Sequence, residues 1–77
     1  MPFRELDTVV LKRDLPEFGL RAGDLGAVVH IHHPDELEVE FVTAAGRTEA
    51  LVALSSADVR PIAETDLVSV RSLRRSA

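Results

Sequence analysis

The feature that most constrains this chain is a strict alternation of apolar and acidic side chains over residues 37–41. The odd positions are apolar and the even positions are glutamates, which is the period of a β-strand with one buried face. Gly46 follows shortly afterwards and can adopt the positive φ that a tight hairpin turn requires. We therefore predict a hairpin with its loop at 45–46, in which inward residues meet only inward residues: Val39 with Val52, Leu37 with Leu54 and Phe41 with Ala50.

The segments before this hairpin predict two more strands and a long loop. Residues 6–11 and 26–32 are rich in β-branched and apolar side chains, which is typical of strands. The segment between them contains Pro16 and several glycines, so it cannot form a long regular element. We expect an ordered loop that turns its apolar side chains inward, namely Leu15, Phe18, Leu20 and Leu25.

The segments after the hairpin complete the expected fold. Residues 55–58 are short and polar and suit one 3₁₀ turn, and Pro61 makes residues 59–62 a short edge strand. A strand, a long loop, a three-stranded meander, a helical turn and a short strand form a small five-stranded SH3-like barrel. We predict this all-β fold for residues 1–63.

Residues 64–77 are expected to form a C-terminal extension with an ambiguous pattern. Leu67, Val70 and Leu73 have the spacing of one helical face, whereas residues 68–71 also suit an edge strand. The helix is the favoured of the two interpretations.

The composition excludes several classes of protein. A chain of 77 residues can build one small core but no deep substrate cavity. The absence of cysteine removes disulfides, thiolate metal sites and thiol catalysis, and favours a cytoplasmic location for so small a domain. The apolar runs are too short to span a membrane, and the first residues do not resemble a signal peptide. We expect no membrane association and no cofactor.

Charge favours a protein partner over nucleic acid. The formal net charge is -4, and most of the acidic side chains lie in the expected barrel. An acidic surface repels phosphate backbones and attracts a basic partner. The extension is the exception, but no aromatic residue that could stack on a base accompanies its arginines, which are Arg71, Arg74 and Arg75.

Two histidines and two glutamates are expected on one outer face of the meander. One hairpin register places His30 opposite Glu40 and His32 opposite Glu38, and a tighter loop places His30 opposite Glu38. Such a set is allowed for zinc, but solvated cross-strand pairs are the commoner arrangement on an open sheet face. We predict no metal site and keep these four residues as weak candidates.

The same outer face is expected to carry three apolar residues beside acidic ones. Adjacent exposed apolar side chains rimmed by acids indicate a contact surface. Cover by barrel curvature or by the C-terminal segment is the alternative. The predicted partner-binding residues are Val28, His30, Glu38, Glu40, Val42, Glu49 and Leu51.

The glycine-rich stretch 23–26 predicts a turn. A phosphate-binding loop needs a helix behind it, whereas a strand is expected here. We expect the glycines to adopt special φ values and the Asp24 carboxylate to accept backbone N–H groups.

The chain resembles a bacterial family of small SH3-like proteins known as domain of unknown function 4926 (DUF4926). The resemblance covers roughly residues 4–62 and is strongest in the string Gly-x-x-x-Gly-Asp-x-Gly-x-Val-Val at 19–29; other matching segments are 6–11, 14–17 and 38–41. It implies a small SH3-like domain without known activity or catalytic residues. It also implies a gene beside that of another small protein, as in toxin–antitoxin or immunity pairs.

These observations predict a non-catalytic protein-interaction module. Ser55 and Ser56 have no evident histidine nearby, and the strand glutamates are expected to be exposed rather than in an apolar pocket. The expected partner is a basic protein, and the module is a candidate antitoxin-like or immunity-like neutraliser of it. The alternatives are a nucleic-acid- or ribosome-associated barrel and a homo-oligomeric structural protein.

Overall fold

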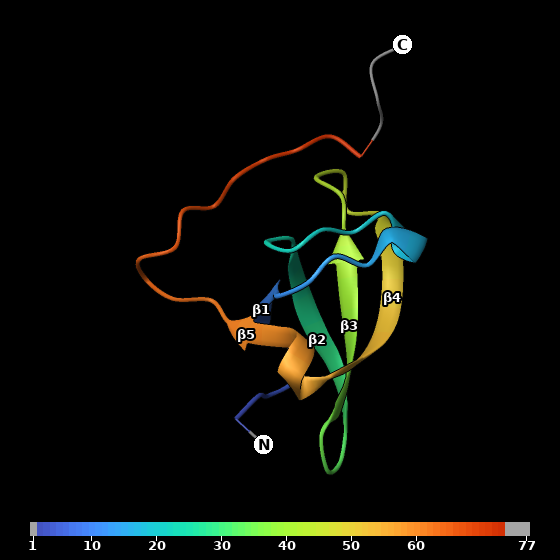
Figure 1. The fold of residues 1–77 in the computed structure, drawn as a ribbon, viewed down its shortest axis with the longest axis vertical. Helices are drawn as coiled ribbons and strands as arrows, with labels where there is room; N and C mark the ends of the chain where they lie inside the picture. Colours follow the sequence, from blue (N-terminus) through green and yellow to red (C-terminus); the bar gives the residue numbers. More distant parts are fainter. Residues whose placement is uncertain (1, 74–77) are drawn as a thin grey trace.

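A computed structural model describes residues 2–73 of the chain. In this range the elements are β1 (Thr8–Leu11), η1 (Pro16–Phe18), β2 (Leu25–His32), β3 (Glu36–Val42), β4 (Thr48–Ser55), η2 (Ser56–Asp58) and β5 (Val59–Pro61), where η denotes a 3₁₀ helix. The strands form one antiparallel sheet in the order β4-β3-β2-β1-β5, which curls around a single core (Figure 1). The sheet is left open between β4 and β5, which η2 joins. The prediction of an all-β, five-stranded SH3-like barrel is confirmed.

The predicted β3–β4 hairpin has the expected register over residues 37–41. The register shifts between Phe41 and Val42, which pairs with Thr48, so the prediction of a two-residue loop at 45–46 is wrong. Val39 pairs with Val52, and the neighbouring inward pairs are Leu37 with Leu54 and Phe41 with Ala50. Gly46 has a φ of 83° at the turn, as its role in the hairpin requires. The alternation of residues 37–41 therefore places the buried face of β3 correctly.

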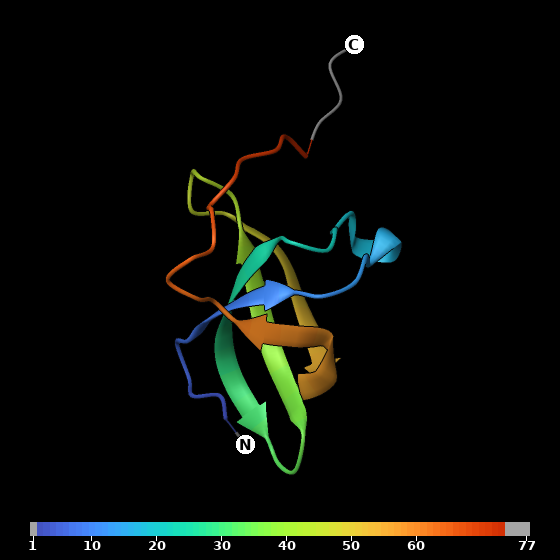
Figure 2. The same ribbon diagram turned by 60° about the vertical axis from the view of Figure 1, so that its left-hand side comes forward.

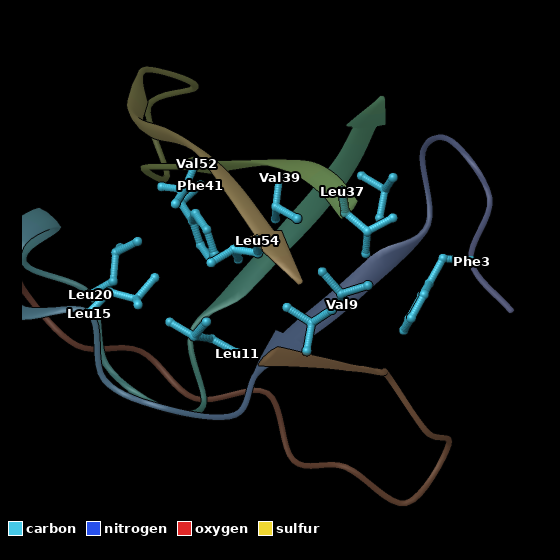
Figure 3. Packing of buried hydrophobic residues seen from close by; sticks show 12 residues of the cluster. Phe3, Val9, Leu11, Leu15, Leu20, Leu37, Val39, Phe41, Val52 and Leu54 are labelled. Atoms are coloured by element: carbon cyan, nitrogen blue, oxygen red, sulfur yellow. The ribbon is translucent and has the colours of Figure 1, made fainter. Parts of the chain in front are cut away.

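The core is built from aliphatic side chains and two phenylalanines (Figure 3). No polar or charged side chain is buried in the part of the chain that the structure describes. The β1–β2 loop closes one end of the barrel, where Leu15 and Leu20 form an isolated bridge and are both buried. The buried cluster consists of Phe3, Val9, Leu11, Leu15, Leu20, Val28, Leu37, Val39, Phe41, Val52, Leu54 and Val59.

Two other residues of this loop region were expected to point inward but do not. Phe18 is 42% exposed because η1 is a single short turn that buries none of its residues. Leu25 is 36% exposed because it pairs with Val10 on the outer side of the sheet, away from the main core. The prediction that these two side chains close the barrel is wrong.

Gly26 allows β2 to pass very close to β3. A Cβ atom at this position would lie 2.5 Å from Val39 Cγ1 and 3.0 Å from Phe41 Cε1. The glycine is therefore required for close packing and not for a positive φ, which corrects the expectation for this residue. Gly23 does have the expected positive φ, at 97°.

The C-terminal extension forms neither a helix nor a strand over residues 62–73. It leaves β5 as an extended tail that runs along the outside of the barrel towards the β3–β4 turn (Figure 2). Arg60 holds its beginning through two hydrogen bonds to the Asp66 carboxylate, of 2.8 and 2.9 Å. These contacts favour the extended path, so the helical interpretation is wrong. Arg74 and Arg75 lie outside the described residues.

Candidate functional site

The outer face of β2, β3 and β4 presents an acidic column on β3, between apolar or small side chains of β4 and two histidines of β2. Glu36, Glu38 and Glu40 alternate with the buried residues of β3 and therefore point outward. On one side Glu40 pairs with Leu51 and Glu38 pairs with Ala53, both on β4. On the other side, β2 contributes the two histidines. We call this surface the acidic face.

Val28 does not belong to the acidic face, contrary to the prediction. It pairs with Val39 and is fully buried, at 0% exposure. The register of β2 shifts between Val28 and His30, so an extra residue, Val29, interrupts the alternation there. This β-bulge returns His30 to the outer face, where it pairs with Glu38. The second of the two predicted registers is the correct one for His30.

The other two apolar residues predicted for this face are exposed. Val42 is 55% exposed and Leu51 is 57% exposed, and they lie diagonally across the β3–β4 ladder. Thr48 donates a hydrogen bond from its hydroxyl to Glu40 Oε2, which positions that carboxylate beside Leu51. Glu49 is also exposed and lies where the register shifts near the start of β4. The structure therefore brings together six of the seven predicted residues.

The histidines and glutamates do not converge on one point. His32 Nε2 lies 3.5 Å from Glu38 Oε2, whereas His30 Nδ1 lies 3.7 Å from Glu5 Oε2 in the N-terminal segment. The two imidazole rings contact each other edge to face, with their centroids 4.4 Å apart. Over residues 2–73, no group of three or more histidine, aspartate or glutamate side chains could hold a metal ion. The geometry fits separate surface pairs.

The turn at residues 21–24 has a second role that the sequence pattern did not predict. Asp24 Oδ2 accepts the backbone N–H of Arg21 at 2.8 Å, as expected for a turn. Both oxygens of the same carboxylate also accept hydrogen bonds from Arg71 of the tail. Arg71 holds the pKa of Asp24 below its ordinary value, with a smaller contribution from the Arg21 backbone. No local sequence signal indicates this contact, because Asp24 and Arg71 are 47 residues apart.

The tail adds apolar side chains beside one end of the acidic face. An open groove separates it from the β3–β4 hairpin, and Val42, Thr48 and Glu49 line one side. Val70 and Leu73 line the other side, and Val70 is 96% exposed. Over residues 62–73 the tail therefore borders Val42 without covering it, and Leu51 is exposed as well.

The fold and this surface define a small SH3-like β-barrel domain with an acidic outer face. The family model "Domain of unknown function (DUF4926)" matches residues 5–61, a span that contains all five strands. The chain belongs to this family, as the resemblance suggested. No curated protein and no solved structure matches the sequence. No helix among residues 2–73 is long and apolar enough to cross a membrane.

Proposed function

We propose that this chain is a non-catalytic protein-interaction module that binds a basic protein through its acidic face. One observation carries the proposal: Val42 and Leu51 are more than half exposed beside the glutamate column of β3. Specific protein–protein interfaces combine buried apolar side chains, which supply affinity, with charged side chains that complement the charge of the partner.

The two kinds of side chain would have different tasks in such a contact. Complete burial of a leucine or valine side chain contributes about 1.5–3 kcal/mol relative to full exposure, so half-exposed Val42 and Leu51 can supply affinity. The glutamates would accelerate encounter with a basic partner and select against acidic ones. The chain's net charge of -4 acts in the same direction.

The module would act by occupancy. A protein whose functional surface is held against the acidic face is unavailable for other reactions, to the extent that mass action sets. The family resemblance implies a neighbouring gene for a small protein, as in toxin–antitoxin or immunity pairs. We therefore propose that the partner is a small basic toxin or enzyme encoded beside this chain, and that the chain neutralises it.

The side chains that could take part in catalysis have other contacts. Ser55 Oγ accepts the backbone N–H of Ala57 at 3.2 Å and so caps η2. The exposed histidines lie on an open sheet face beside carboxylates rather than beside a nucleophile. These contacts favour a binding role over an enzymatic one.

Copurification from the native host tests the proposal. The tagged chain should retain a basic protein in stoichiometric amount, and Leu51→Asp should release it while the thermal unfolding curve stays unchanged. Leu67→Asp is the matched control, because Leu67 is 95% exposed on the tail, away from the acidic face. Retention of no stoichiometric partner by the wild-type chain would contradict the proposal.

Self-association is the second candidate function, because the same exposed Val42 and Leu51 could pair between copies. Light scattering distinguishes it, since a monomer at high concentration excludes it. Association with nucleic acid or the ribosome has weaker support, because the guanidinium of Arg71 is engaged by Asp24. A salt titration of RNA binding tests it, and absence of binding at low salt excludes it.

A further inference from the structure

The strand β4 is an open edge of the sheet. It pairs with β3 on one side and is the last strand in the sheet order on the other (Figure 1). Unpaired edge strands are normally protected by short length, proline or charge. The opposite edge, β5, has three residues and contains Arg60 and Pro61, whereas β4 has eight residues and Glu49 is its only charged one. Of the two edges, β4 is the unprotected one.

The backbone geometry identifies which groups of β4 are available. Ser56 N donates to Asp35 O at 2.8 Å, in the same register as the β3–β4 ladder. In an antiparallel ladder, the residues that exchange hydrogen bonds recur at every second position. The inward residues of β4 therefore bond to β3. The N–H and C=O groups of Leu51 and Ala53 point away from β3, out of the open edge.

The glutamates of the acidic column lie one strand away from this edge. Ala53 pairs with Glu38 and Ser55 pairs with Glu36, so only small side chains separate the edge from these carboxylates. A strand added at β4 would lie about two strand spacings, roughly 10 Å, from β3. A lysine or arginine opposite Ala53 could extend over its methyl group to Glu38. Opposite Leu51, an apolar residue would fit best.

We propose that β4 is a β-augmentation site for an extended segment with alternating basic side chains and an apolar residue opposite Leu51. This inference rests on the proposed function and names the manner of contact: backbone pairing at β4 supplies affinity, and the glutamates on β3 select basic side chains. The sheet would then have six strands, with β4 in its interior.

Charge argues against a second copy of this chain as the occupant. Two β4 strands paired about a twofold axis at Leu51 would place Glu49 of one copy opposite Ala53 of the other. That glutamate would then lie one strand away from Glu38, and like charges at such a distance disfavour pairing. A basic strand at the same position gains an attraction instead.

The probe is the peptide acetyl-Lys-Thr-Lys-Thr-Val-Thr-Lys-Thr-Lys-amide, added at millimolar concentration to the isotopically labelled full chain. The largest amide shift changes should occur at Leu51 and Ala53, and the exchange of these two amides with solvent should slow. A peptide with glutamate in place of every lysine should not bind. Methylation of the lysine and valine amide nitrogens, which removes their backbone donors and keeps the charge, should weaken binding about tenfold or more, equivalent to about 1.4 kcal/mol.

Ala53→Pro is the variant that separates backbone pairing from charge. It removes an N–H that β3 does not use, and proline is tolerated at such edge positions. Binding of the lysine peptide should fall about tenfold in Ala53→Pro, and also in Glu38→Gln. If Ala53→Pro does not fold, the methylated peptide alone tests whether binding depends on backbone pairing.

Three results would overturn this inference. One is binding that depends on Glu38 but is unaffected by Ala53→Pro and by backbone methylation; the acidic face would then bind without augmentation, and the proposed function would stand. Another is the absence of any binding of the lysine peptide. The third is a dimer of the free chain whose Leu51 and Ala53 amides are already protected. The copurification experiment tests the proposed function separately: if no partner is retained, the proposed function fails whatever the peptide experiments show.

Discussion

Arg71 donates hydrogen bonds to both carboxylate oxygens of Asp24, 47 residues earlier in the chain, including one of 2.9 Å from Nε to Oδ1. The same guanidinium donates to Gly19 O at 3.0 Å. The C-terminal tail is thereby attached to the β1–β2 loop. Since Asp24 also accepts the backbone N–H of Arg21, one carboxylate organises both the turn and the tail.

Removal of the Arg71 guanidinium should free the tail and leave the barrel intact. In Arg71→Ala, NMR relaxation should show increased motion in residues 67–73, with a loss of about 1 kcal/mol or less in the free energy of unfolding, because the pair is only partly buried. Asp24→Ala should cost more, since it also removes the turn acceptor. Equal effects of the two substitutions would show that the turn bond contributes nothing.

The contact between Asp66 and Arg60 should survive to unusually low pH. Hydrogen bonds from Arg60, and then from the Ala63 backbone, lower the pKa of Asp66 to about 2 from 3.8. Because the pKa is lowered in the folded state, the stabilisation is complete above about pH 3.8 and disappears as the pH falls through about 2. The carboxyl carbon resonance of Asp66 should titrate with a midpoint near 2. A midpoint near 4 would show that the pair does not form in solution.

The pairing of β3 with β4 could be predicted from the sequence because the polarity of each β3 residue indicates which face of the sheet it occupies. A glutamate between two apolar residues cannot face a dry core without a large cost, so the positions of Glu38 and Glu40 determine the register with β4. The segment Ala27-Val28-Val29 contains no such marker, because every side chain in it is apolar. The sequence therefore does not indicate the bulge after Val28, and it cannot show that Val28 faces the core.

The burial of Val28 predicts that an aspartate will cost much more stability at the buried valines than at an exposed one. Val28→Asp should unfold the domain, because it places an unpaired charge in a core without polar groups. Val39→Asp, at the paired position, should do the same. Val42→Asp should leave the thermal unfolding midpoint nearly unchanged, since that side chain is 55% exposed. A folded Val28→Asp variant would show that the bulge is misplaced.

Gly26 should tolerate no larger side chain. The added methyl group of Gly26→Ala would overlap Val39 Cγ1, so β2 or the core must shift, at a cost of about 1–3 kcal/mol in the free energy of unfolding. Gly19→Asn is the control, because its position is open and asparagine accepts a positive φ better than most residues. Denaturant unfolding measures both variants, and a smaller loss for Gly26→Ala than for Gly19→Asn would contradict the close approach of the strands.

The path of the tail was beyond sequence reasoning for a different reason. The spacing of Leu67, Val70 and Leu73 does suit a helix, but helices of this length gain most of their stability from packing an apolar face. Here Leu67 and Val70 are almost fully exposed, and Asp66 and Arg71 instead make contacts with the barrel. A partner 47 residues away, as Asp24 is from Arg71, cannot be identified from local spacing.

Charge reversal on the acidic face tests the central claim most directly. Glu38→Lys lies in the glutamate column, and Glu64→Lys makes the same change in net charge on the tail, where Glu64 is exposed. The amount of partner retained from the native host should be unchanged with Glu64→Lys and strongly reduced with Glu38→Lys, at equal thermal stability. Equal retention by the two variants would contradict a partner site on the outer face of β2, β3 and β4.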